Sequence, residues 1–521
     1  MAASAIVLAT LNAKYIHASL GLRYLLANMA RHGGDELRVR TLLREFTIAR
    51  VPQDIVDELL ALDPAIVGFG VYIWNVAQTT EVVRLLKAVR PAVKVVLGGP
   101  EVSHEVEQQE IVRLADHVIT GWGDVSFPKL CHSLLHGPAP LMKIIPGEQP
   151  PLDDIALPYA EYRDEDLAHR LLYVEASRGC PFKCEFCLSS LDKTAWAFDL
   201  DAFLAEMEAL HRRGARHFKF VDRTFNLKLE NSLRILQFFL ERLSDDLFVH
   251  FEVVPDHLPE RLKEMIARFP PGVLQFEVGI QSFNEDVQRR ISRKQDNAKT
   301  ETNLRWLVRE SGAHLHADLI FGLPGETLES FAAGFDRLYA LGPHEIQLGI
   351  LKRLRGTPIA RHTAEHGMVY DEAAPYTVRR TGVVDADTLQ GFMRLARYWD
   401  LIANSGRFGR TLPLLLQGPS AFIAFRVFSD WLWQRHGETA RLTPEQLVDA
   451  LSDYLIQQRG LAADTVRQAL LADYLASGAR ARPAALKEVL PPQATPVPRS
   501  ARQRAERQAR HLEAGAAKID A

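Results

Sequence analysis

The sequence predicts an α/β protein with an N-terminal Rossmann-like doubly wound domain, then a partial (β/α)6 TIM-like barrel, then a mainly helical C-terminal domain. Two series in which short β-branched runs alternate with amphipathic stretches predict the first two domains. Aromatic residues at helical spacing predict the third. The chain has 521 residues, of which 47% are hydrophobic and 24% charged. It therefore has the length and composition of a folded protein with several domains.

The N-terminal domain is expected over residues 1–137. Its strand candidates are rich in β-branched residues, and glycine-containing loops follow several of them. In a doubly wound sheet, ligands bind at the carboxyl ends of the strands, so these loops are the candidate binding site. The strand candidates are residues 5–9, 66–71, 93–97 and 117–120, and helical patterns lie at 19–31, 52–62, 76–90 and 105–115.

The barrel is expected over residues 168–360, after a proline-rich linker at 138–167. Six βα units are too few for a closed eight-fold barrel and enough for an open, partial one. The barrel rule places the chemistry at the carboxyl ends of the strands. The strand candidates are residues 172–176, 218–221, 248–253, 274–278, 314–319 and 345–350.

After the barrel the alternation ends. Residues 361–485 contain helical segments with aromatic residues on one face, which is typical of a helical packing domain. Residues 486–521 are rich in proline, alanine and arginine, and we expect a basic, disordered tail there.

Charge and hydropathy restrict the partners. The formal net charge is −3, which gives no electrostatic argument for nucleic acid as a partner. No run of about 18 apolar residues is present, so we expect no membrane span. The first residues lack the basic region of a signal peptide and lead directly into a strand candidate, which favours a cytoplasmic location.

Three of the four cysteines lie close together after the first barrel strand. Cys180, Cys184 and Cys187 have the spacing Cys-x3-Cys-x2-Cys, whereas Cys131 stands alone. Three thiolates can hold three irons of a [4Fe–4S] cluster and leave the fourth iron open to another ligand. The alternative is a structural zinc site, which needs four closed ligands; no second pair is visible, although a distant histidine could complete it.

The stretch Cys180-Pro-Phe-Lys-Cys184-Glu-Phe-Cys187 resembles the signature of the radical S-adenosylmethionine (radical SAM) enzymes. The resemblance implies that the three cysteines hold a [4Fe–4S] cluster whose fourth iron is chelated by S-adenosyl-L-methionine (SAM). One electron from the reduced cluster would then cleave SAM to methionine and a 5′-deoxyadenosyl radical, which abstracts a substrate hydrogen. An electron donor such as flavodoxin or ferredoxin is implied as a partner.

Polar residues and glycines at later strand ends fit a SAM site of this family. Each alone is typical of a cap or turn, but their order behind the cysteine motif supports the resemblance. The candidates are Asp222, Thr224 and Asn226 after the second strand, Glu277, Gln281 and Ser282 on the fourth, and Asp318, Gly322 and Glu326 after the fifth.

The N-terminal domain resembles that of the cobalamin-binding subfamily of radical SAM enzymes. The resemblance rests on three loops of small residues at neighbouring strand ends, and it implies a corrin beside them. The candidate cobalamin-binding residues are Gly70, Tyr72, Trp74, Gly98, Gly99, Pro100, Gly121 and Gly123. The Asp-x-His-x-x-Gly motif that ligates cobalt in many cobalamin domains is missing. The nearest histidine, His17, is either a cobalt ligand or, as we favour, a capping or packing residue.

Residues 351–407 resemble a subgroup whose C-terminal domain has no assigned chemistry. Within this region Lys352, Arg353 and Arg355 follow the sixth barrel strand. They either contact an anionic substrate or are solvated loop charges.

Together these features predict a cobalamin-dependent radical SAM enzyme that methylates an unactivated carbon of a small-molecule substrate. Oxidation, cyclisation or rearrangement by the same cofactors is an alternative, and a non-catalytic cobalamin or cluster sensor is an alternative of another class. A methylthiotransferase would need further cysteines in the N-terminal domain, which contributes only Cys131.

Overall fold

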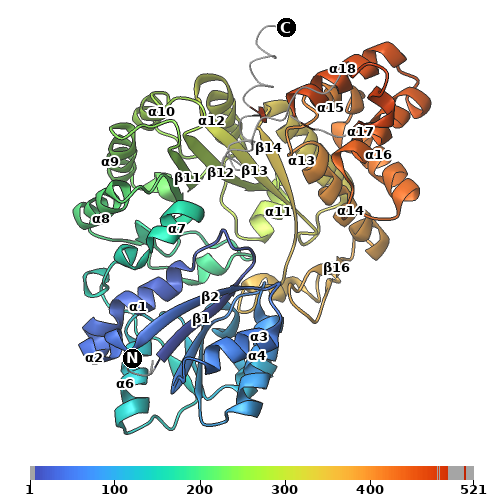
Figure 1. Ribbon diagram of the computed structural model, residues 1–521. Helices are drawn as coiled ribbons and strands as arrows, with labels where there is room; N and C mark the ends of the chain where they lie inside the picture. Colours follow the sequence, from blue (N-terminus) through green and yellow to red (C-terminus); the bar gives the residue numbers. More distant parts are fainter. Residues whose placement is uncertain (1–5, 478, 480–481, 491–509, 512–521) are drawn as a thin grey trace. The chain divides into compact units, whose positions relative to one another are not determined.

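The computed structural model describes residues 6–477, 479, 482–490 and 510–511 (Figure 1). Most of the tail expected at 486–521 therefore lies outside the described residues. Contacts divide the chain into two compact units. The first contains Met1–Phe251, Lys352–Arg361 and Tyr370–Thr377, and the second contains Glu252–Leu351, His362–Val369 and Val378–Ala521.

The first unit begins with a six-stranded parallel sheet in the order β2-β1-β3-β4-β5-β6. The strand order reverses between β1 and β3, so the carboxyl ends of these two strands form the switch point where doubly wound sheets bind ligands. The strands are β1 (Ile6–Asn12), β2 (Thr41–Thr47), β3 (Ile66–Gly70), β4 (Lys94–Gly98), β5 (His117–Thr120) and β6 (Ile144–Pro146).

Helices cover both faces of this sheet. Alternate residues of β1 explain why: Val7, Ala9 and Leu11 pack into one apolar core, and Ile6 and Leu8 into another. The first core is covered by α3 (Pro52–Leu60), α4 (Val76–Val89) and α5 (Glu110–Leu114), and the second by α1 (Leu20–Gly33), α2 (Asp35–Val39) and α6 (Ser126–His136).

The second series of strands agrees with all six sequence candidates and is divided between the two units, with the boundary inside the third strand. In the first unit β10 pairs in parallel with β7 and β11. In the second unit β13 pairs in parallel with β12 and β14. The strands are β7 (Leu172–Val174), β10 (His217–Phe220), β11 (Phe248–Val253), β12 (Leu274–Gln281), β13 (His314–Phe321) and β14 (Glu345–Ile350).

Helices alternate with these strands, as the βα arrangement requires; the first of them precedes β7, and the others each come after a strand of the series. In the first unit they are α7 (Asp164–His169), α8 (Leu200–Arg212) and α9 (Leu229–Leu240); in the second they are α10 (Glu260–Ile266), α11 (Glu285–Arg290), α12 (Asn297–Glu310) and α13 (Leu328–Leu341). Short strands β8 (Ser177–Arg178) and β9 (Trp196–Ala197) pair antiparallel, and β15 (Val369–Tyr370) and β16 (Val378–Arg380) come late in the chain.

The remainder of the second unit is helical, as predicted. Its helices are α14 (Ala386–Ile402), α15 (Thr411–Leu415), α16 (Ala421–His436), α17 (Pro444–Asp453) and α18 (Ala463–Ala476). Aromatic rings join this region to the βα part of its unit: Trp399 packs edge-on against Phe335, with ring centroids 4.9 Å apart, and donates a hydrogen bond to the Ile346 carbonyl. The fold class predicted from the sequence is therefore confirmed. Among the described residues, no helix is long and apolar enough to cross a membrane.

A buried ion network ties α1, β2 and α7 together in the first unit. Arg23 is 1% exposed and lies 2.9 Å from Glu45 and 2.8 Å from Asp166, and Arg170 lies 2.8 Å from Glu45. The Arg23 guanidinium also stacks over the Tyr162 ring, 4.6 Å from its centroid. Asp166 and Tyr162 belong to the stretch that the sequence suggested as a linker, so this stretch is fixed to the N-terminal sheet.

Replacing Arg23 tests this network. We expect Arg23→Leu to lower the free energy of unfolding by about 3–5 kcal/mol, because two buried carboxylates lose a cation. The matched control is Arg31→Leu on the same helix, whose side chain is 44% exposed, with an expected loss of about 0–1 kcal/mol. Thermal melting of both variants is the measurement. Equal melting temperatures for Arg23→Leu and wild type would contradict the assignment.

Candidate functional site

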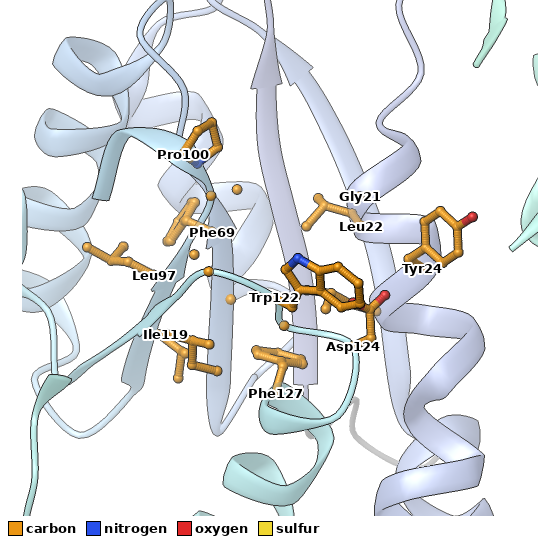
Figure 2. A pocket seen from close by; sticks show the side chains of 18 of the residues that line it. Gly21, Leu22, Tyr24, Phe69, Leu97, Pro100, Ile119, Trp122, Asp124 and Phe127 are labelled. Atoms are coloured by element: carbon orange, nitrogen blue, oxygen red, sulfur yellow. The ribbon is translucent and has the colours of Figure 1, made fainter. Parts of the chain in front are cut away.

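A cavity of about 460 Å³ lies at the carboxyl ends of β3, β4 and β5, against α1 (Figure 2). Its wall is mainly apolar, and the labelled Leu22, Phe69, Ile119, Trp122 and Phe127 surround it in Figure 2. Seven of the eight candidate cobalamin-binding residues line it: Gly70, Tyr72, Gly98, Gly99, Pro100, Gly121 and Gly123.

Trp74, the eighth candidate, is not part of the cavity wall. Its ring stacks on Tyr72 with centroids 4.5 Å apart and an interplanar angle of 7°. Trp74 therefore contacts the wall residue Tyr72 and not the cavity itself. Stacking of this kind holds the Tyr72 ring in one orientation.

Gly98, at the end of β4, and Gly99, directly after it, show how the backbone forms this part of the cavity wall. Gly99 has φ +108°, and a Cβ there would lie 2.5 Å from the Val71 carbonyl oxygen, so a side chain is excluded. At Gly98 the nearest atom to a Cβ is the Ile119 carbonyl oxygen at 3.9 Å. A side chain at Gly98 is therefore compatible with the fold but takes up space at the cavity.

The three clustered cysteines lie on a loop that is held by hydrogen bonds to its backbone carbonyls. Cys180 and Cys184 are buried, Cys187 is half-buried, and none of the three forms a disulfide bond. Ser190 donates hydrogen bonds to the carbonyls of Cys184 and Cys187 at 2.9 and 2.7 Å. Burial first, and then the neighbouring thiols, raise the pKa of Cys180. Three cysteines on one loop, none of them in a disulfide bond, fit a [4Fe–4S] cluster with three protein ligands.

The cavity wall and the cysteine loop are directly connected. The indole N–H of Trp122 donates to the Asp192 carboxylate at 2.7 Å, and the Asp192 carbonyl accepts from the Cys180 N–H at 2.9 Å. Arg178, two residues before Cys180, itself lines the cavity. One residue, Asp192, thus bonds to both the cavity wall and the cysteine loop.

Arg178 is a buried cation surrounded by rings and carboxylates. Its guanidinium lies 4.7 Å from the ring centroids of Tyr24 and Trp122, and it pairs with Asp124 at 2.8 Å and Glu175 at 3.2 Å. Burial lowers the pKa of Arg178, but Glu175 and Asp124 outweigh it and raise the pKa above its ordinary value. Arg178 therefore remains charged beside the cavity.

Three of the nine candidate SAM residues lie in the first unit. Asp222 follows β10 and is 3% exposed; its carboxylate accepts hydrogen bonds from the Ala176 N–H at 3.0 Å and the Ser177 hydroxyl at 2.5 Å. Asp222 therefore holds the start of the segment that leads to Cys180. Asn226 is fully buried, and Thr224 is half-buried.

The other six candidates lie in the second unit. There Ser282 donates a hydrogen bond to Glu326, which is 1% exposed. Burial raises the pKa of Glu326 to about 7. Gly322 has φ +86°, which a turn after β13 requires. Glu277, Gln281 and Asp318 are half-buried on β12 and β13.

His17 does not line the cavity. Its Nδ1 lies 2.7 Å from the Tyr173 hydroxyl, and its backbone bridges to Leu171. The packing role favoured from the sequence agrees with this position.

The sequence interpretation overlooked Arg178 and Asp192; for Arg178 the available signal was its place directly before Gly179 and Cys180.

Comparison with known proteins relates each part of the chain to a family. Residues 174–338 match the radical SAM superfamily, residues 6–131 match the B12 binding domain, and residues 364–520 match a protein family of unknown function (DUF4080).

Among similar proteins, an uncharacterized methyltransferase, PH0819 of Pyrococcus horikoshii, is 27% identical over 60% of this chain and 71% of its own length. The cobalamin-dependent radical SAM methyltransferase TokK of Streptomyces tokunonensis is 26% identical over 59% of this chain, and the match spans about half (49%) of TokK.

Two solved structures share the fold. The cobalamin-dependent SAM radical enzyme OxsB, solved with aqua-cobalamin and SAM, aligns with a TM-score of 0.64 and 13% identity over 99% of this chain and 84% of its own. The radical SAM methyltransferase TsrM of Kitasatospora setae aligns with a TM-score of 0.56 and 18% identity over 71% of this chain and 79% of its own.

The cavity can be tested by filling it. We expect Gly98→Leu to weaken hydroxocobalamin binding ~10-fold or more, because the side chain occupies space that the ligand needs. Gly98→Ala, which adds one methyl group, is the size control and should bind more tightly than Gly98→Leu. Equilibrium titration followed by absorbance measures both. Unchanged affinity in Gly98→Leu would place the corrinoid elsewhere.

Asp222 predicts a pH dependence of stability. Burial raises its pKa from 3.8 to about 7, against the hydrogen bonds from Ser177 and Ala176. The folded state thus binds this proton more tightly than the unfolded chain does. The resulting stability is complete below pH ~4 and is lost as the pH rises to about 7. We expect the melting temperature of Asp222→Asn, relative to wild type, to rise between pH 4 and 7 and then level off. A difference that is constant over this range would refute the burial argument.

Proposed function

Because the chain belongs to the radical SAM enzymes that carry a B12-binding domain, we propose that it methylates an unactivated carbon of a small-molecule substrate. Its cofactors are SAM, a [4Fe–4S] cluster and cobalamin. An electron donor of the flavodoxin or ferredoxin class is part of the proposal, since the cluster must be reduced before each turnover.

One observation carries the proposal: the cavity at the N-terminal sheet adjoins the cysteine loop through Asp192 and Arg178. An enzyme that uses a corrinoid and a cluster in one reaction needs the two groups close together, because reaction requires near contact of the reacting atoms. Neighbouring sites within one compact unit meet this need. A sensor that binds only one of the two groups does not.

The relatives support methyl transfer over the other reactions of the family. PH0819 and TokK are both named methyltransferases, and a tryptophan 2-C-methyltransferase of Streptomyces laurentii is 29% identical over 31% of this chain.

A methylthiotransferase is disfavoured by Cys131. This cysteine is fully buried in the apolar core beneath α6, and burial raises its pKa, so it is unsuited to bind a second cluster.

When bound, the cluster supplies an electron that cleaves SAM, and cobalamin supplies a carrier for the methyl group. The protein residues have separate roles. Cys180, Cys184 and Cys187 hold the cluster, and Asp222 fixes the approach to their loop through Ser177. The indole of Trp122 forms part of the cavity wall and links it to that loop through Asp192. We assign Glu326, held by Ser282, to binding a polar group of SAM.

The stoichiometry of products tests this function. Methyl transfer consumes two SAM molecules: one gives 5′-deoxyadenosine, and the other gives S-adenosylhomocysteine when its methyl group is transferred. We therefore expect equal amounts of the two products when reconstituted, reduced protein is incubated anaerobically with SAM, hydroxocobalamin and a metabolite extract. With trideuteromethyl SAM, one metabolite should gain a trideuteromethyl group.

Two variants control this experiment. Cys184→Ala should lose both products because the cluster loses a ligand, whereas Cys131→Ala should retain both. If wild type forms 5′-deoxyadenosine without S-adenosylhomocysteine, the reaction is an oxidation, cyclisation or rearrangement and not a methylation. Release of neither product by wild type would refute the radical mechanism.

A further inference from the structure

A short charged segment after the barrel contacts both loops of the candidate site. Residues 353–361, here called the strap, belong to the first unit together with these loops. One loop, the cavity loop (residues 99–109), follows β4 and begins with the cavity residues Gly99 and Pro100. The other is the cysteine loop (residues 177–192). The arginines of the strap, Arg353, Arg355 and Arg361, each pair with a carboxylate of one of these loops.

The first contact is buried. Arg355 donates to the Glu101 carboxylate at 2.9 Å and to the Tyr376 hydroxyl at 3.0 Å, and Tyr376 donates to the same carboxylate. Glu101 is 4% exposed and directly follows the cavity residue Pro100. Burial, and then Glu101, raise the pKa of Tyr376 to about 12, so its hydroxyl keeps its proton at physiological pH.

The second contact fixes the middle of the cavity loop. Arg353 lies 3.0 Å from Glu105, and the N–H of Gly356 donates to the same carboxylate at 3.3 Å. Gly356 has φ +77°, and a Cβ there would lie 2.3 Å from the His104 ring. Only glycine permits this close approach of the strap to His104.

The third contact is with the cysteine loop. The N–H of Ile359 donates to the Glu185 carbonyl at 3.0 Å, and Arg361 pairs with the Glu185 carboxylate. Glu185 is 3% exposed and lies between Cys184 and Cys187. The strap therefore holds the cysteine loop from within the cysteine motif.

The strap is too short to absorb a shift at one end. Only five residues separate Arg355 from Arg361, and a 3₁₀ turn (Pro358–His362) that begins at Pro358 includes Arg361. Proline fixes φ and removes a degree of freedom from the chain. The segment between the two loops is therefore short and restrained at Pro358.

We propose that the strap sets the position of the cavity loop relative to the cysteine loop, and that Arg355 and Arg361 are positioning residues that keep SAM cleavage coupled to methyl transfer. This inference rests on the proposed function for its consequence in catalysis. The mechanical coupling of the two loops does not depend on it.

The test asks whether a change at one end of the strap reaches the other loop. Arg361→Gln removes the ion pair with Glu185, and its side chain is 62% exposed, so the variant should fold. We expect amide hydrogen exchange in residues 99–109 of the full chain to rise ~5-fold or more in this variant. Reciprocally, Arg355→Gln should raise exchange in residues 177–192 to a similar extent.

A matched control is Arg90→Gln, which removes an exposed pair with Asp63 (2.9 Å) in the same unit. It should leave exchange in both loops unchanged. Circular dichroism and thermal melting check that each variant is folded. If each strap variant changes exchange only in the loop that it touches, the contacts of the strap with the two loops are independent and the inference is overturned.

Reconstituted enzyme gives a second readout. In Arg355→Gln and Arg361→Gln we expect the ratio of 5′-deoxyadenosine to S-adenosylhomocysteine to rise several-fold above that of wild type, because SAM cleavage proceeds without transfer. Wild-type ratios in variants with altered exchange would overturn the catalytic role. Failure of the proposed function appears differently: wild type itself would then lack one or both products, whereas the exchange result would stand.

Discussion

The hydrogen-bonded contact between the cavity wall and the cysteine loop is the interaction on which the rest of the site depends. Asp192 accepts from the Trp122 indole through its carboxylate and from the Cys180 N–H through its carbonyl, so a single residue fixes both elements. Arg178 adds a second link, since it lines the cavity and lies two residues before Cys180. Asp192 and Arg178 are both partly buried, and hydrogen bonds to charged groups contribute more to stability there than in solvent.

The need to fix the cysteine loop against the cavity wall explains the charged residues that lie in the interior of this unit. A loop that must stay in place beside a cofactor cannot rely on apolar packing alone, because packing is not directional. Buried or half-buried arginines, each with two carboxylate partners, give direction: Arg23 holds the stretch that precedes β7, Arg178 the cysteine loop and Arg355 the cavity loop. Each is costly to bury and more costly to leave unpaired, so these pairs specify one arrangement.

Local sequence patterns predicted the fold because the strands and helices are regular. The alternation in β1 and the spacing in the cysteine motif are local properties, and the cavity glycines were found because they follow strands of a doubly wound sheet. The strand β2 was overlooked because charged Arg44 and Glu45 interrupt its apolar run, and β6 because it is only three residues long. Glu45 is explained by its buried partners, which are distant in sequence.

Contacts between residues that are distant in sequence could not be predicted, because a local pattern carries no information about a distant partner. Nothing near Tyr376 in the sequence indicates that it bonds to Glu101, and the arginines of the strap have the same local pattern as solvated charges. The candidate SAM and cobalamin residues remain predictions, whereas the family and the cofactors are confirmed.

Electron paramagnetic resonance tests most directly whether the two cofactor sites adjoin. The measurement is the relaxation of the Co(II) signal of bound cobalamin in full-length protein, with the cluster reduced and with the cluster absent after Cys184→Ala. If the cavity and the cysteine loop are neighbours, the reduced cluster should speed relaxation of the cobalt signal in wild type. Identical relaxation in the two proteins, with cobalamin bound to both, would contradict the account.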